Sequence, residues 1–236
     1  MDEQAAGTLL EQASHTEFSP SWISEIRALG WDLDGTLYRD VPEIRERMEG
    51  QVLTTISERL GQDLAWVKKE YRQRLRKIGS NTKVIGSFGL DGPEVVDLSF
   101  DQIPFEQLLR PDPKLKRMFA SLPNLRHVLI THNRIDQARR KLACLGLPES
   151  VFTLVVPVYD WEMSKQDPSL YRKVLELLTI RPHQMLYLGD REAVDILPAR
   201  EAGLRTGMVW GDSSAADISL PTVYDVGELF QVTSEK

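Results

Sequence analysis

Two aspartates in the stretch DLDGT, Asp32 and Asp34, are the residues best suited to chemistry, and they follow the mostly apolar residues 26–31. In a strand, alternate side chains share a face, so we expect both carboxylates to point the same way. Close carboxylates repel each other unless a cation lies between them, and Mg²⁺ typically binds carboxylates together with phosphate oxygens and water. The pair also suits covalent catalysis, in which one Asp attacks phosphorus while the other transfers a proton. The competing interpretation is a polar turn in which Asp34 caps a helix.

Polar residues also end or follow three later apolar runs. Thr131 ends the run HVLIT, Lys165 follows the run VFTLVVP, and Asp190 ends the run MLYLGD. Asp195 lies five residues after Asp190, at the start of a predicted helix. Each has a plain alternative, because the threonine and the two acids could cap helices and a lone lysine is usually solvated. Their shared position at strand ends nevertheless favours one common site.

The apolar runs predict the strands of a parallel sheet. Near-continuous apolar runs that alternate with helical patterns are typical of an α/β fold with helices on both faces of the sheet. We therefore predict a Rossmann-like parallel sheet whose ligands bind at the carboxyl ends of the strands. The predicted strands are 28–33, 126–132, 151–157, 184–190 and 204–210, and the helices that alternate with them are 134–147, 167–178 and 193–203.

One segment, residues 41–110, interrupts this alternation. Residues 42–60 and 64–78 have the periodicity of amphipathic helices, whereas residues 80–104 read as a loop with a short helix. We predict a small helical cap inserted after the first core strand, and we call this segment the insertion. Gly35 permits the sharp turn that leads the chain toward it.

Outside the insertion, the sequence predicts a tail and a core made of two segments. Residues 1–20 form a flexible tail, and residues 21–40 and 111–236 form the core. The core resumes with a helix that has Pro113 near its start.

Composition restricts the partners. The chain has 236 residues and a net charge of −6, with a pI of about 5.4, which argues against a nucleic-acid polymer as partner. No apolar run reaches the roughly 18 residues of a membrane span. The single cysteine, Cys144, excludes an internal disulfide and fits a reducing compartment. With an acidic N-terminal stretch that does not read as a secretory signal, we expect a cytoplasmic protein. The oligomeric state stays open.

Four motifs in order resemble those of the haloacid dehalogenase superfamily of phosphohydrolases, over about residues 24–212. They are DLDGTLY, VLITHN, SKQDP and GDREAVDILPAREAG. The insertion lies where that family has its helical cap. The family usually has Pro directly after the motif lysine, whereas this chain has Gln166 there.

The resemblance implies roles for individual residues. Asp32 would be the nucleophile that forms an aspartyl-phosphate, and Asp34 would be the general acid and then the base that activates water. Thr131 would donate a hydrogen bond to the phosphoryl oxygens, and Lys165 would neutralise negative charge. These roles agree with phosphoryl transfer, which depends mainly on positioning and charge neutralisation.

The resemblance also implies Mg²⁺ as cofactor. Asp32, the backbone carbonyl of Asp34 and Asp190 would hold the ion, and Asp195 would lie in or just behind its coordination shell. Four neighbouring residues are expected to bind substrate: Gly35, Thr36, His132 and Asn133.

The substrate class and one alternative function follow from these motifs. The stretches EYRQRLRKIGSNTKVIG and LLRPDPKLKRMF resemble the cap of pyrimidine 5′-nucleotidase-like members, which implies a nucleoside monophosphate among small phosphorylated metabolites. Dehalogenation needs a nucleophilic Asp but no second, proton-handling Asp, so Asp34 favours phosphate chemistry. The alternative from another class is a non-enzymatic binding or regulatory domain on the same scaffold.

Overall fold

The computed structural model describes residues 20–231. The tail predicted for residues 1–20 therefore lies, apart from Pro20, outside the described residues. Within the described part, six parallel strands form one sheet in the order β3-β2-β1-β4-β5-β6, which confirms the predicted fold class. The strands are β1 (Ala28–Trp31), β2 (Arg126–Thr131), β3 (Leu154–Pro157), β4 (Met185–Gly189), β5 (Arg205–Val209) and β6 (Ile218–Leu220).

Strand β1 lies in the middle of the sheet, between β2 and β4. Trp31, its last residue, is level with Leu129 of β2 and Leu188 of β4. All four β1 residues are buried, as expected for a central strand covered on both faces. The chain segments that leave the ends of β1, β2 and β4 therefore start side by side.

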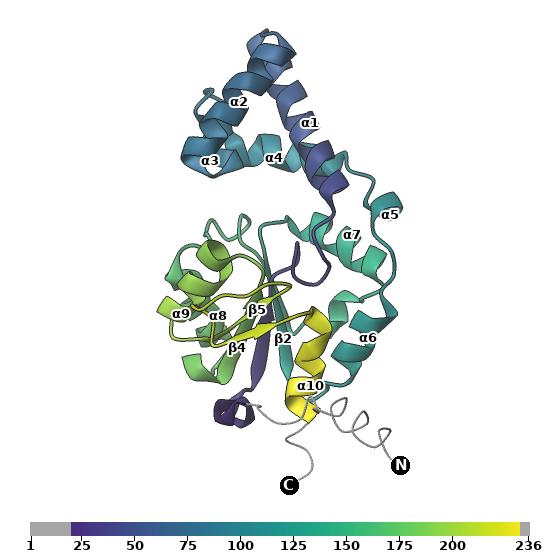
Figure 1. Ribbon diagram of the computed structural model, residues 1–236, viewed down its shortest axis with the longest axis vertical. Coiled ribbons are helices and arrows are strands. Elements are labelled where there is room, and N and C mark those ends of the chain that lie inside the picture. The colour runs from purple at the N-terminus through teal and green to yellow at the C-terminus, as the bar shows by residue number, and fades with distance from the viewer. Residues whose placement is uncertain (1–19, 232–236) are drawn as a thin grey trace, which may run out of the picture.

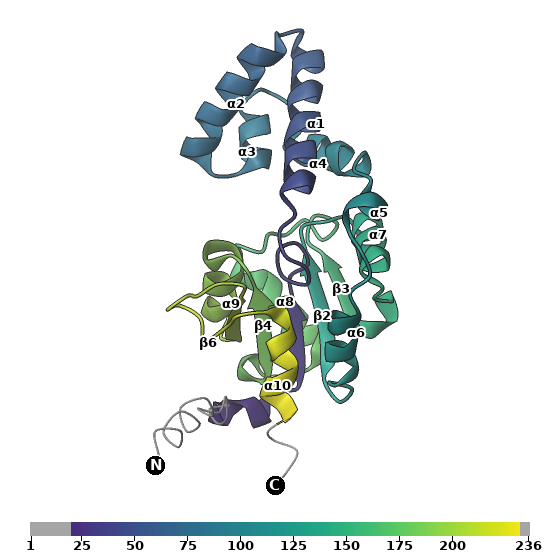
Figure 2. The same ribbon diagram turned by 45° about the vertical axis from the view of Figure 1, so that its right-hand side comes forward.

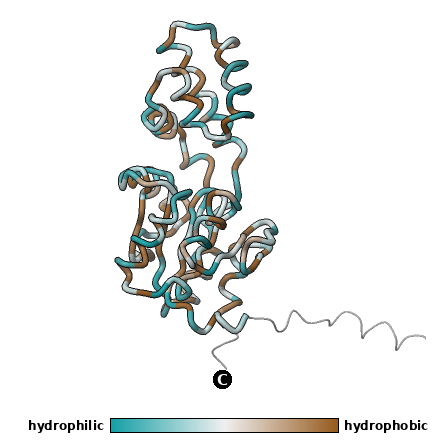
Figure 3. The backbone as a smooth tube through the Cα atoms, turned by 90° about the vertical axis from the view of Figure 1, so that its left-hand side faces the viewer, coloured by the Kyte–Doolittle hydropathy of each residue, from teal (hydrophilic) through white to brown (hydrophobic). Residues whose placement is uncertain are grey.

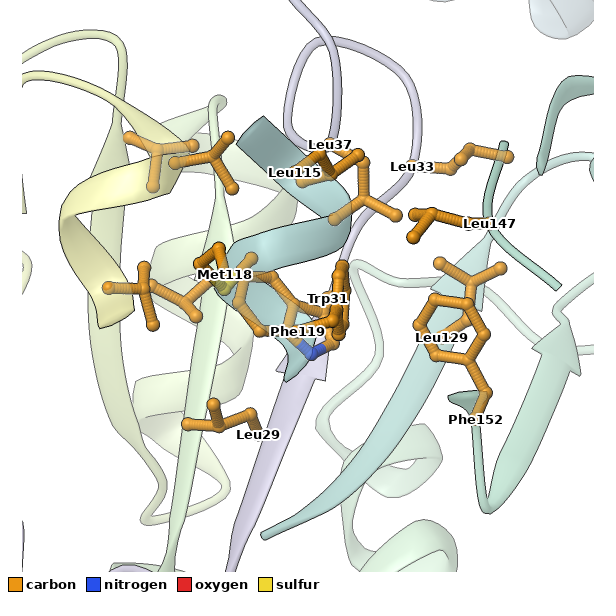
Figure 4. Close-up of a cluster of buried hydrophobic side chains, with 14 of the residues drawn as sticks. Leu29, Trp31, Leu33, Leu37, Leu115, Met118, Phe119, Leu129, Leu147 and Phe152 are labelled. Atoms are coloured by element: carbon orange, nitrogen blue, oxygen red, sulfur yellow. The ribbon is translucent and has the colours of Figure 1, made fainter. Parts of the chain in front are cut away.

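Helices cover both faces of the sheet (Figures 1 and 2). On one face, α6, α7 and α10 pack on the side of Trp31, whose ring lies 5.0 Å from that of Phe119 between centroids (Figure 4). On the other face, α8 and α9 bury Leu170 and Ala199 against Val128 of β2. These helices are α6 (Pro113–Ala120), α7 (Ile135–Leu145), α8 (Pro168–Leu178), α9 (Leu197–Glu201) and α10 (Val226–Gln231). Short helical turns are η1 (Ser21–Glu25), η2 (Glu149–Val151), η3 (Pro182–Gln184), η4 (Glu192–Ile196) and η5 (Val223–Asp225).

The insertion follows β1 and has a core of its own. Val52, Ile56, Val67, Val84 and Val95 lie in one buried cluster that joins its helices. Figure 1 shows α1–α4 above the end of the sheet, and the tube in Figure 3 alternates between hydrophobic and hydrophilic residues along them, as amphipathic helices do. The helices are α1 (Pro42–Leu60), α2 (Leu64–Ile78), α3 (Asn81–Gly86), α4 (Gly92–Asp101) and α5 (Phe105–Leu108).

The structure corrects the prediction for residues 80–104, a loop with one short helix. This segment holds two helices, α3 and α4. Asp91 caps α4 by accepting a hydrogen bond from the Glu94 amide at 2.9 Å. Both helices are short and glycine-rich at their ends, so their apolar pairs complete few turns of a recognisable period. The short edge strand β6 was also not predicted.

None of the helices in residues 20–231 is both long and apolar enough to cross a membrane.

Burial of the β2 residue His127 against Phe119 of α6 generates a prediction about stability and pH. The Trp31 indole donates to Nδ1 of His127 at 3.2 Å, and burial lowers the pKa of His127 to about 4. In the unfolded chain, His127 binds a proton below its ordinary pKa of about 6.5, whereas in the folded protein it stays neutral down to about pH 4. Protonation therefore favours the unfolded state, and the free energy of unfolding falls as pH is lowered from about 6.5 toward 4. We expect His127 to account for roughly 2 kcal/mol of lost stability at pH 5.

The test compares urea unfolding at pH 7.5 and pH 5.0. His127→Gln keeps an acceptor for Trp31 but cannot titrate, so its loss of stability on acidification should be smaller by that amount. His183→Gln, at a partly exposed histidine in the η3 turn before β4, serves as control and should behave as wild type. Equal acid sensitivity of His127→Gln and wild type would contradict the prediction.

Candidate active site

The predicted site residues meet at the carboxyl edge of the sheet. Asp32 directly follows β1, Thr131 ends β2, and Asp190 directly follows β4, while Lys165 lies on the segment between β3 and α8. The first strand ends at Trp31, two residues earlier than predicted, so Asp34 belongs to the turn after it. The alternation argument therefore does not apply to Asp34, and the two aspartates bind different lysines.

Asp32 belongs to a buried acidic cluster with Asp190 and Asp195. One carboxylate oxygen from each lies within 4.8 Å of the others. The buried Lys165 ammonium donates to Asp32 and, at 3.0 Å, to Asp195. Burial raises the pKa of Asp32 to about 7, and the nearby Lys165 charge only partly opposes this rise. Arg191 adds a second positive charge, with its Nε 4.0 Å from Asp190 Oδ1 and 3.9 Å from Asp195 Oδ2. Three carboxylates beside these two cations still leave negative charge for a further cation to balance.

Asp195 is fixed by the protein itself. Its Oδ1 also accepts from the Tyr187 hydroxyl at 3.3 Å, and its Oδ2 accepts from the Arg191 backbone N–H at 3.2 Å. It lies in η4, a π-helical turn, and packs so closely on Gly189 that a Cβ there would overlap it. Both Asp195 oxygens are thus engaged, which favours a supporting position for this residue.

Asp32 and Asp190 retain free oxygen capacity. Asp32 Oδ2 is buried and has no hydrogen-bond partner among the described residues. Asp190 is half-buried and accepts only a long bond, 3.4 Å, from the Thr36 hydroxyl among the side-chain hydrogen bonds described. A hard divalent cation takes carboxylate oxygens and tolerates few protein ligands, so these residues fit Mg²⁺. An unpartnered buried carboxylate oxygen is otherwise costly.

Asp34 is held by a second network. Its carboxylate accepts from Lys141 at 2.6 Å, from the Tyr38 hydroxyl and from the Asn133 amide. Asn133 also donates to the Thr131 hydroxyl at 2.7 Å. Burial alone would raise the pKa of Asp34, but the Lys141 charge and these hydrogen bonds lower it to about 2.

A cavity of about 510 Å³ lies between the insertion and this edge of the sheet. The core side of its lining includes five residues that the sequence predicted, Asp34, Gly35, His132, Asn133 and Asp190. It also includes five that were not predicted as site residues, Tyr38, Tyr159, Gln166, Arg191 and Val194. Burial lowers the pKa of His132 to about 3, so a neutral imidazole faces the cavity at neutral pH. The insertion contributes, among others, Ile44, Met48, Ser80, Asn81, Thr82 and Phe100.

The remaining predicted residues lie behind this lining. Thr36, Thr131 and Lys165 are buried, and each hydrogen-bonds a site residue rather than standing free. Sequence reasoning missed Lys141, although a signal was present. A charged residue on the apolar stripe of a predicted amphipathic helix, here between Ala138 and Leu145, needs a buried partner.

The turn at Gly35 generates a second prediction. Gly35 has a φ of +84°, and a Cβ there would overlap the Asp190 carboxylate. We expect Gly35→Ala to lower stability by about 1–3 kcal/mol and to displace Asp190, because both the backbone and the space require glycine. We expect Mg²⁺ to raise the melting temperature of wild type and expect this rise to be lost in the variant.

Thermal unfolding with and without Mg²⁺ tests this expectation. Gly50→Ala is the matched control, because Gly50 lies inside α1 with open space around its Cα and should gain up to about 1 kcal/mol. An unchanged Mg²⁺ response in Gly35→Ala would show that the turn does not position the cation ligands.

Comparisons with known proteins agree with this architecture. Among solved structures, the HAD phosphatase from Thermococcus onnurineus is similar with a TM-score of 0.66 and 20% identity, over 89% of this chain and 99% of that chain. A 2-haloacid dehalogenase from Pseudomonas syringae is similar with a TM-score of 0.58 and 18% identity, over 89% of this chain and 100% of that chain. The magnesium-bound HAD-hydrolase YfnB from Bacillus subtilis has a TM-score of 0.59 and 17% identity, over 87% and 99%.

At these identities, the similarities show a shared fold and leave the reaction open, since the structures include both a phosphatase and a dehalogenase. A search of curated proteins found no match to the sequence. The model of the haloacid dehalogenase-like hydrolase family matches residues 26–203, which contain all four motifs and more than half of the chain. The protein therefore belongs to the haloacid dehalogenase-like hydrolases.

Proposed function

We propose that the protein is a Mg²⁺-dependent phosphatase that hydrolyses a small phosphate monoester through an aspartyl-phosphate. The observation that carries the proposal is the pairing of two differently placed carboxylates. Asp32 is buried in an acidic cluster that fits Mg²⁺, and Asp34 lies two residues later on the wall of a cavity. A dehalogenase needs the first of these aspartates but neither the metal nor the second.

The proposed reaction has two displacements at phosphorus, and the site residues have separate roles in them. Asp34, which Lys141 keeps ionised in the resting site, first takes up a proton from the monoanionic phosphate ester. A carboxylate oxygen of Asp32 then forms a bond to phosphorus, and the ester oxygen leaves with the bonding electrons and takes this proton from Asp34. A water then attacks the aspartyl-phosphate, gives its proton to Asp34, and inorganic phosphate departs as the Asp32 carboxylate is restored. Lys165 and the Thr131 hydroxyl support the transferred group from the core side. Asp32 and Asp190 would hold Mg²⁺, which would neutralise negative charge on the phosphoryl oxygens.

Within this class, we infer a nucleoside 5′-monophosphate as the substrate. The cavity volume is within the range of pockets that hold ligands of this size. Phe100 and Tyr159 offer aromatic surface to a planar base, while Ser80, Asn81 and Thr82 offer short polar side chains to a sugar. The weak resemblance of the insertion to nucleotidase caps supports the same class.

Phosphate release from a panel of esters tests the proposed reaction. The panel holds uridine 5′-monophosphate, glycerol 3-phosphate, glucose 6-phosphate and p-nitrophenyl phosphate, each with Mg²⁺ and with EDTA. We expect Mg²⁺-dependent release, fastest from the nucleotide, and at least about a 10³-fold loss in Asp32→Asn, because an amide is no nucleophile. Asp212→Asn, at an exposed site, should retain full activity.

The same preparations are tested for chloride release from 2-chloropropionate. Chloride release without Mg²⁺ and no phosphate release would overturn the proposed function in favour of dehalogenation. No release of either product would favour the binding or regulatory alternative.

Asp34→Asn tests the division of roles. The amide cannot give or take the proton, so turnover should fall by about 10²–10⁴ while the aspartyl-phosphate forms slowly and is not cleared. Acid quenching after incubation with ³²P-labelled substrate should show protein-bound label in this variant and none in Asp32→Asn. Normal turnover in Asp34→Asn would remove Asp34 from proton transfer.

A further inference from the structure

Lys141 is a buried cation that the proposed reaction does not use. It lies on α7, and its side chain is fully inaccessible to solvent. Its ammonium donates to Asp34 Oδ1 at 2.6 Å and to Asn133 Oδ1 at 2.6 Å. A buried ammonium needs such partners, since losing its hydration is costly, and both partners line the cavity.

The two bonds from Lys141 close a ring of contacts around Asp34. Asn133 accepts from Lys141 through its oxygen, and its amide nitrogen donates to Asp34 Oδ2. Lys141 itself reaches Asp34 Oδ1, so the two carboxylate oxygens are held by two linked groups. The plane of the carboxylate is thereby fixed rather than free to rotate.

The other side of the ammonium faces the insertion. Its Nζ lies 4.7 Å from the ring centroid of Phe100 and 4.8 Å from that of Phe105. Cation–π attraction at these distances links Lys141 to α4 and α5. Phe100 also lines the cavity, so one lysine contacts the group that transfers protons and a residue of the substrate-facing wall.

We propose that Lys141 is a positioning residue, which holds Asp34 in the orientation that exchanges a proton with the leaving group and with water. The proposal rests on the proposed phosphatase function and extends it to a residue outside the four motifs. A merely structural ion pair would stabilise the fold without favouring any step of the reaction. The two readings differ in how the variant responds to the leaving group.

The test measures kcat/KM of Lys141→Met for two kinds of ester. One is p-nitrophenyl phosphate, whose phenolate leaves without needing a proton, and the other is whichever alkyl phosphate of the panel wild type turns over fastest. Since kcat/KM reports steps up to aspartyl-phosphate formation, the alkyl ester should lose about 10²-fold and p-nitrophenyl phosphate less than about 5-fold. A stopped-flow burst of p-nitrophenolate should remain, followed by slow turnover.

Gln137→Met is the matched control. Gln137 is equally buried on α7, one turn before Lys141, and contacts the insertion through Asp97 and Asp101 without touching Asp34. It should change kcat/KM for both esters by the same small factor. Asp34→Asn should reproduce the leaving-group pattern, and adding Lys141→Met to it should cost nothing further. Equal losses for both esters in Lys141→Met would overturn the proposal.

Two further measurements keep the outcome decisive. Lys141→Gln, which keeps a donor without the charge, replaces the Met variant if circular dichroism shows that Lys141→Met does not fold. If wild type hydrolyses no ester, the proposed function fails, and melting temperatures then test the Lys141–Asp34 contact on which the inference rests. Lys141→Met should lower the melting temperature of wild type more than that of Asp34→Asn, and equal shifts in both backgrounds would overturn the inference.

Discussion

The site depends on one buried ammonium, that of Lys165, between Asp32 and Asp195. A charge removed from water needs partners of opposite sign, and the sheet provides them because the segments after β1 and β4 start side by side. The same burial explains why glycine stands at positions 35 and 189, where a Cβ would overlap the acids that surround this charge. The lysine thus fixes where the acids lie, and their surplus negative charge makes the cluster suitable for a divalent cation.

A second ion pair gives the neighbouring aspartate a different character. Asp34 pairs with Lys141 from α7 and lies on the wall of the cavity, whereas Asp32 is enclosed. The pKa of Asp32 is raised by burial and that of Asp34 is lowered by its cation, so two acids separated by one residue differ in their affinity for protons. In the proposed reaction Asp32 must be ionised, which a cation bound beside it would favour, whereas Asp34 must take up a proton before it can act as an acid.

Much of the architecture could be predicted because buried parallel strands are nearly continuous apolar runs. Helix α1 was predicted at its observed bounds, since Pro42 starts it and Gly61 ends it in a left-handed conformation. The sequence did not distinguish helices α3 and α4 from a loop, because each helix is too short to show a clear apolar periodicity. The polar residues at strand ends were found by position alone, but Lys141 was not, since its partner Asp34 lies 107 residues away in sequence and only the fold brings them together.

The turn after β1 shows how contacts distant in sequence set local conformation. Trp210, directly after β5, has a φ of +64° and donates its indole N–H to the Thr36 carbonyl at 2.9 Å. A bulky residue in the left-handed region is strained, so the surrounding structure must hold it there. The strain lies at a residue that supports the turn carrying Gly35 and Asp34, and not in either acid. Lys165 already holds the nucleophile Asp32 in place. Proton transfer also requires a fixed position for Asp34, and a rigid support of the turn that carries it serves this requirement.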